Sequence, residues 1–71
     1  MDRLNEIIRN LEEELKMNDT ATYYALIKTI EDNELWTLLV MHFVSCLWID
    51  VKIINNFEYE DLVEMRISKK L

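Results

Sequence analysis

Apolar residues follow two patterns in this chain, an almost unbroken run in the middle and regular stripes on either side of it. Residues 35–49 carry no charge, and only Thr37, His42, Ser45 and Cys46 interrupt the run. A helix that is apolar all round must be covered on every side. The run therefore predicts a buried central helix that starts at Glu34 or Leu35 and is capped by Asn33.

Three flanking segments have the apolar spacing of amphipathic helices. The first covers residues 2–17, and the second runs from the break at residues 18–20 to residue 32. The third follows Asn55 or Asn56 and has acidic residues first and basic residues last, which suits the helix dipole. The predicted stripes are Leu4, Ile7, Ile8, Leu11 and Leu15; Tyr23, Leu26, Ile27 and Ile30; and Tyr59, Leu62, Val63 and Ile67.

Residues 48–54 favour a strand as an alternative, because apolar and charged residues alternate there and β-branched residues are enriched. A tight hairpin at the following asparagines would pair Ile53 with Glu58 and Val51 with Glu60. That register sets core residues against carboxylates on one face, so it is disfavoured. A strand at this position would need a longer loop or a second chain as its partner.

Size and composition favour helices. The chain has 71 residues, enough for one small domain over residues 1–71, and it has no glycine and no proline for tight turns. We therefore predict a mainly α fold, a bundle of three to four short helices around the central apolar helix, which becomes α+β if residues 48–54 form a strand. Cores of this size are weak, so a homodimer that covers part of the apolar surface is an open alternative.

The sequence offers little for catalysis or cofactor binding. His42 and Cys46 are spaced to share one helix face, but a zinc site needs three or four ligands. Burial in an apolar run raises a thiol pKa instead of activating the thiol. No glycine-rich loop is present to hold a phosphate. We predict a protein that is not an enzyme and binds no metal and no cofactor.

Three features of the sequence indicate the cellular location of the protein. The apolar run of about 15 residues is shorter than the ~20 that span a bilayer, and no secretory signal precedes it. A single cysteine fits a reducing compartment. We expect a cytoplasmic protein that is not embedded in a membrane.

Carboxylates are the main candidate for a binding function. Fourteen acidic residues outnumber eight basic ones, which gives a net charge of -6 and argues against direct nucleic-acid binding. Successive carboxylates on one helix face rise about 6 Å, close to the spacing of phosphates along a DNA strand. Solubility alone is the competing explanation. The predicted partner-binding residues are Glu12, Glu13, Glu31, Asp32, Glu34, Glu58, Glu60, Asp61 and Glu64.

The acidic clusters Glu12-Glu13-Glu14 and Glu58 to Glu64, in a short chain without a catalytic motif, carry a resemblance. The chain resembles small acidic host-takeover proteins of bacteriophages, in particular DNA mimics that inhibit the histone-like protein HU. The resemblance rests on size and charge over the whole chain. It implies a host bacterial cytoplasm as the location and a basic DNA-binding protein of the host as the partner.

Two functions from different classes follow. The first is a non-enzymatic acidic inhibitor that presents carboxylates to a basic DNA-binding protein. The alternative is a small helical adaptor or oligomerisation module that binds a protein partner through apolar surface around Trp36, Phe43 and Trp48. Salt separates them, because binding through carboxylates weakens as ionic strength rises whereas apolar docking does not.

Overall fold

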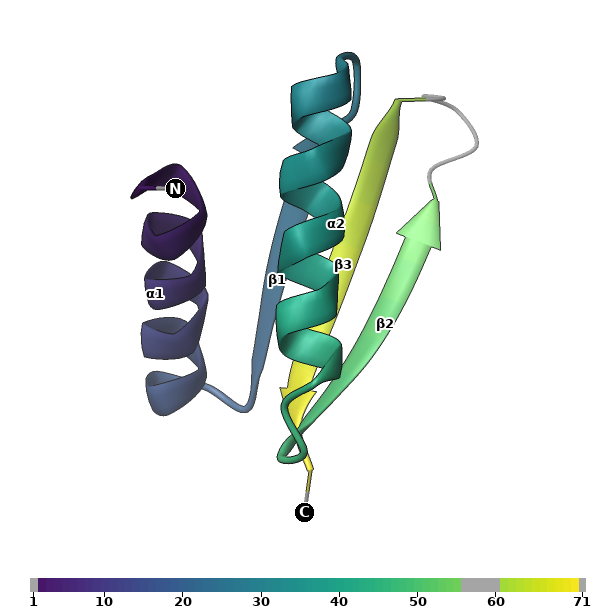
Figure 1. The fold of residues 1–71 in the computed structure, drawn as a ribbon. Helices are drawn as coiled ribbons and strands as arrows, with labels where there is room; N and C mark the ends of the chain where they lie inside the picture. The colour runs from purple at the N-terminus through teal and green to yellow at the C-terminus, as the bar shows by residue number, and fades with distance from the viewer. Residues whose placement is uncertain (1, 56–60, 71) are drawn as a thin grey trace.

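In the computed structural model, two helices lie on one face of a three-stranded antiparallel sheet (Figure 1). The structure describes residues 2–55 and 61–70. The prediction of a mainly α bundle is therefore wrong, and the fold is α+β. The elements in chain order are α1 (Asp2–Met17), β1 (Thr20–Leu26), α2 (Ile30–Val44), β2 (Ile49–Asn55) and β3 (Leu62–Lys69).

The last strand in the chain lies in the centre of the sheet. The strand order is β1-β3-β2, and β3 is antiparallel to both neighbours. β1 and β2 are consequently parallel to each other, and α2 connects them, so the three strands and α2 form a split β-α-β unit. The register places Thr22 and Lys52 opposite Arg66, one from each outer strand. Within the part of the chain that the structure describes, each outer strand pairs along one edge only.

α1 confirms the predicted amphipathic helix at residues 2–17. Its bounds are the predicted ones, and Leu11 and Leu15 on its apolar stripe are buried. α1 packs against β1, and its polar side faces solvent. Regular 3.6-residue spacing over four turns gave a correct prediction here because burial on one face of α1 follows that spacing.

The predicted second helix is wrong, because residues 20–26 form β1. Its apparent helical stripe included Tyr23 and Leu26, but in β1 these residues lie on opposite faces of the sheet. Ala21 is buried and Tyr23 is half-buried toward the helices, while Thr20 and Thr22 face outward. Threonine and tyrosine favour strands, and the sheet pairing with β3 outweighs the helical spacing.

α2 begins earlier and ends earlier than predicted. Its cap is Thr29 and not Asn33, since the backbone N–H of Asp32 donates to the Thr29 hydroxyl at 3.0 Å and the Asp32 carboxylate accepts from the Thr29 N–H at 3.2 Å. This reciprocal capping box fixes the first turn. The helix ends at Val44, and Ser45 is its C-cap. The predicted central helix at residues 35–49 thus continues beyond the real helix into β2.

The strand alternative at residues 48–54 is confirmed as β2, and its partner is the segment predicted to be a helix. β3 pairs with β2 in a register that sets Ile53 opposite Met65. The segment that joins β2 to β3 is longer than the two-residue loop of a tight hairpin. Val63, Met65 and Ile67 alternate with polar residues and point toward the helices. That alternation is the strand signal that the helical stripe at Leu62, Val63 and Ile67 obscured.

The core lies between the helices and the sheet. Its side chains come from all five elements, and the opposite face of the sheet is open to solvent. No polar side chain is buried among the residues that the structure describes. The buried residues are Leu11, Leu15, Ala21, Leu39, Phe43, Ile49, Met65 and Ile67.

A conservative change in the centre of the sheet should measure how tightly this core is packed. Ile67 is fully buried on β3. We expect Ile67→Val to lower the free energy of unfolding by about 0.5–1.5 kcal/mol, because it leaves a methyl-sized cavity. Urea unfolding followed by circular dichroism measures the change. Ile30→Val, at an exposed position of α2, is the matched control and should change stability by less than about 0.5 kcal/mol; equal losses would contradict the described core.

Candidate functional site

α2 presents apolar side chains on its outer side as well as to the core. Leu38, Met41 and Val44 are exposed by 39%, 62% and 62%, and we call these three residues the α2 ridge. They are spaced by three residues, so they are neighbours along one face of the helix. Two further exposed apolar residues, Leu47 and Trp48, follow the end of α2. The expectation that the apolar run is covered on every side is therefore wrong.

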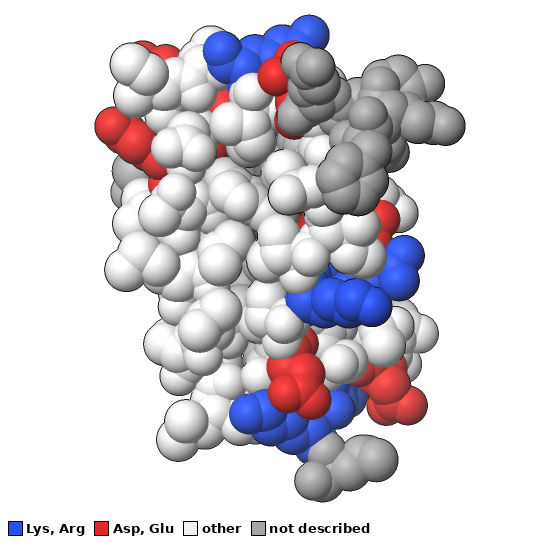
Figure 2. All heavy atoms as spheres, turned by 90° about the vertical axis from the view of Figure 1, so that its right-hand side faces the viewer, with Lys and Arg blue, Asp and Glu red and all other residues white. Residues whose placement is uncertain are grey.

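The view from the β2 side shows the consequence for the surface (Figure 2). α2 lies toward the left in this view, and most of that half of the surface carries no charge. Charged atoms gather at the upper end, along the sheet on the right and at the lower end. Exposed apolar residues that are neighbours, as those of the α2 ridge are, mark interaction sites, whereas scattered single apolar residues do not.

Two carboxylates lie at the start of the same helix. Glu31 and Glu34 are exposed, and both were predicted partner-binding residues. Glu34 precedes Leu38 by four residues, which places it next to the α2 ridge. The apolar surface of α2 therefore has an acidic border at its N-terminal end.

Asp32, the third predicted carboxylate of this group, serves the fold. Its carboxylate accepts the backbone N–H groups of Lys28 and Thr29, each at 3.2 Å. The hydrogen bond from the Lys28 backbone is the largest cause that lowers the pKa of Asp32 below its ordinary value of 3.8. Asp32 is thus a capping residue of α2, and capping accounts for its charge without any partner.

The predicted carboxylates on α1 are directed to a different part of the surface. Glu13 is exposed, and Glu12 is half-buried with its carboxylate 4.0 Å from Nε2 of His42 on α2. That contact connects the two helices. The α1 carboxylates and those at the start of α2 therefore do not form one continuous row.

The remaining predicted carboxylates are near β3. Asp61 is exposed before the strand, while Glu64 lies on the open face of the sheet and forms an ion pair with Arg66. Hydrogen bonding to the Glu64 carboxylate, together with its negative charge, raises the pKa of Tyr24 on the neighbouring strand. Glu58 and Glu60 lie outside the described residues.

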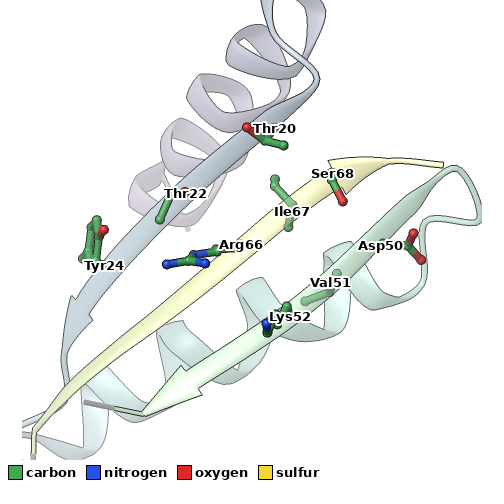
Figure 3. A pocket seen from close by; sticks show the side chains of 9 residues that line it. All are labelled: Thr20, Thr22, Tyr24, Asp50, Val51, Lys52, Arg66, Ile67 and Ser68. Atoms are coloured by element: carbon green, nitrogen blue, oxygen red, sulfur yellow. The ribbon is translucent and has the colours of Figure 1, made fainter. Parts of the chain in front are cut away.

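The open face of the sheet has a shallow hollow of about 660 Å³ (Figure 3). Arg66 lies in the middle of this face, with Thr22 on one side and Lys52 on the other. The next row contains Thr20, Ser68 and Asp50. This face was not predicted from the sequence, because two of its three strands were predicted to be helices. Acidic and basic side chains alternate on it, so it does not form a patch of one sign.

The histidine and the cysteine of the apolar run do not form a reactive pair. The Cys46 thiol donates to the backbone carbonyl of His42 at 3.3 Å. The His42 ring lies edge-on to Phe43, with ring centroids 5.0 Å apart, and near Glu12. Within residues 2–55 and 61–70, no three histidine, cysteine or acidic side chains are grouped as metal ligands.

The alternative adaptor function was predicted to use Trp36, Phe43 and Trp48. Of these aromatic residues, some lie in the core and one lies on the surface. Phe43 is fully buried, and Trp36 is half-buried against Tyr23, with ring centroids 6.4 Å apart. Trp48 alone of the three is largely accessible, at 49%. The apolar surface available to a partner is consequently formed by aliphatic residues and Trp48, and not by the predicted trio.

Comparison of the chain with protein-family models, with curated proteins and with solved structures gives no match. Neither of the helices in the described part of the chain has both the length and the apolar character to cross a membrane. The surfaces described above are therefore the basis for assigning a function.

The capping role of Asp32 leads to a pH-dependent prediction. A lowered pKa in the folded state contributes stability at pH values above about 4, where the unfolded carboxyl is ionised, and that contribution is lost as the pH falls through the folded pKa. Asp32→Asn should therefore be less stable than the wild type at pH 7, and the difference should shrink as the pH falls below about 4. Urea unfolding at pH 7 and at successively lower pH measures the difference in the free energy of unfolding between the two proteins.

Glu31→Gln is the control for that experiment, since it removes a charge from the same turn without changing the capping box. The free energy of unfolding of Glu31→Gln should depend on pH in nearly the same way as that of the wild type. The same pH dependence in both variants would contradict the capping role.

Proposed function

We propose that this protein is a non-enzymatic binding module that docks the α2 ridge onto another protein. The observation that carries the proposal is the exposure of Leu38, Met41 and Val44 in a row on a rigid helix. An amphipathic or apolar helix face binds by lying in an apolar groove of its partner, with contacts every three or four residues. The two large residues after the helix, Leu47 and Trp48, are also exposed and could add to the contact.

The charge of the chain indicates which kind of groove would fit. Glu31 and Glu34 border the ridge at its start, and the whole chain carries a net charge of -6. A partner with an apolar groove edged by lysine or arginine side chains complements both features. Electrostatic attraction would speed the encounter, and the apolar contacts would determine how long the complex lasts.

A competing proposal is an acidic DNA mimic that inhibits a host DNA-binding protein such as histone-like HU. It is supported by the excess of acidic residues and by the exposed carboxylates Glu13, Glu31, Glu34 and Asp61. DNA mimicry requires carboxylates in a regular row, and the described ones are divided between α1, the start of α2 and β3. We therefore place apolar docking first and the mimic second.

Binding measurements on surface variants test the proposal. The immobilised wild-type protein is incubated with bacterial lysate, a protein that it retains and blank beads do not is identified by mass spectrometry, and that protein is then purified for calorimetric titration. Met41→Glu should weaken its Kd by about tenfold or more, because a charge on the ridge must be desolvated in the groove. Met41 is 62% exposed, so the variant should fold normally, which circular dichroism verifies.

The matched variant is Glu31→Gln/Glu34→Gln. For apolar docking it should weaken the Kd only about two- to threefold at roughly 0.15 M salt, since exposed ion pairs contribute little. A DNA mimic would show the opposite ranking, with steep loss of binding on raising the salt. Identical binding by Met41→Glu and the wild type would overturn the proposal.

A further inference from the structure

Among residues 2–55 and 61–70, β2 has no strand partner along one of its two edges. It is the last strand of the order β1-β3-β2, so only one of its two sides bonds to a neighbour. Ile53 lies on its helix-facing side and is still 43% exposed. An exposed edge strand with apolar residues is a template for pairing with another strand.

The backbone of β2 shows which of its groups are free. The N–H of Lys70 donates to the carbonyl of Trp48 at 2.9 Å, which continues the β2–β3 ladder by one pair. Successive residues of a strand direct their backbone groups to opposite sides. Val51 and Ile53 therefore direct both of their backbone groups away from β3, toward the open edge. Ile49 directs its carbonyl there, while its N–H donates to the Cys46 carbonyl at 3.2 Å.

The sequence of this strand is complementary to itself. Read in either direction, Ile49-Asp50-Val51-Lys52-Ile53 gives three apolar residues separated by two charges of opposite sign. In an antiparallel pair centred on Val51, each Asp50 lies opposite the Lys52 of the other copy, and each Ile49 lies opposite Ile53. A two-fold symmetric contact needs this self-complementarity.

Charge selects this register over its neighbours. The free backbone groups also meet if the pair is centred on Asp50 or on Lys52. Those registers set Asp50 against itself or Lys52 against itself, and like charges directly opposite are destabilising. In the register centred on Val51 the charged residues form a non-hydrogen-bonded pair, in which side chains approach most closely.

We propose that β2 pairs with β2 of a second copy of this chain, antiparallel and centred on Val51, to form a continuous six-stranded sheet. The pairing closes the β2 edge and brings Ile53 of one copy against Ile49 of the other. α2 packs on β2, so the two copies of α2 come to lie on the same face of the joined sheet. Arg66 and Lys52 lie side by side on the open face (Figure 3). In the dimer this charged row would continue to Asp50 of the second copy.

The dimer is independent of the proposed docking function. It uses the edge of β2, whereas docking uses the outer side of α2. Met41→Glu should therefore leave the dimer unchanged, and the β2 variants described next should leave the Kd for each docking partner within about twofold.

A charge swap across the two-fold axis tests the pairing. Sedimentation equilibrium of the full chain over micromolar to millimolar concentrations should show a monomer–dimer equilibrium. Lys52→Asp places a carboxylate opposite Asp50 at both pairs, so repulsion replaces attraction and dimerisation should weaken by about tenfold or more. Asp50→Lys/Lys52→Asp should restore it to within about threefold, because the same two pairs form with their signs exchanged.

The controls exclude unfolding and a general charge effect. Lys52 lies opposite Arg66 inside the monomer, so Lys52→Asp creates an opposite-charge pair in the sheet and does not weaken the fold. Arg9→Asp makes the same charge change on the exposed side of α1 and should leave the dimer intact. Hydrogen exchange locates the contact at β2, since the Val51 amide should exchange more slowly as the wild-type concentration rises; the charge swap identifies the register.

Three results with the wild type and the β2 variants would overturn the proposal. They are a wild-type chain that stays monomeric at millimolar concentration, a dimer that Lys52→Asp leaves unchanged, and a double variant that folds but does not dimerise. A dimer that is lost on Met41→Glu instead would place self-association on the α2 ridge and would overturn it as well.

Discussion

The structure depends on the packing of α2 against the sheet. The uncharged part of α2 is apolar on all sides, and the sheet can cover only one side of it. Leu39 and Phe43 are fully buried and belong to one core cluster with Met65 and Ile67 of β3. A three-stranded sheet and one further helix supply no second layer above α2, so its outer residues stay exposed. The same apolar composition therefore accounts for both the stability of the fold and its most conspicuous surface.

The sequence predicts the parts of the fold in which spacing and burial agree. α1 has a regular stripe over four turns, and β2 has a clear alternation, so both are found with bounds that are close to correct. β1 and β3 fail for one reason. Their apolar residues are dense enough to fit both a helical and a strand period, and the outcome is decided by pairing between segments far apart in the chain, such as Thr22 and Arg66.

The candidate site was predictable in composition but not in position. Counting carboxylates could not separate Asp32, which caps α2, or Glu64, which pairs with Arg66, from the freely exposed Glu31 and Glu34. A search for a reciprocal cap would have found Thr29 and Asp32, three residues apart. The apolar ridge was assigned to the core because an uncharged helix is normally covered. Here the outer side of α2 is not covered, and this follows only from the number of layers in the fold.

The two surfaces of this protein have different physical requirements and can act together. Strand pairing at β2 depends on backbone geometry and on a charge pattern that only the same chain repeats, so it is selective for a second copy. Docking through α2 depends on apolar contact, which fits any groove of suitable shape and is the less selective of the two. A dimer joined at β2 would present two α2 ridges from one rigid sheet, and a partner with two grooves at matching distance would bind both with a gain from effective concentration. Weak apolar docking by a single small helix could in this way become tight without any additional contact.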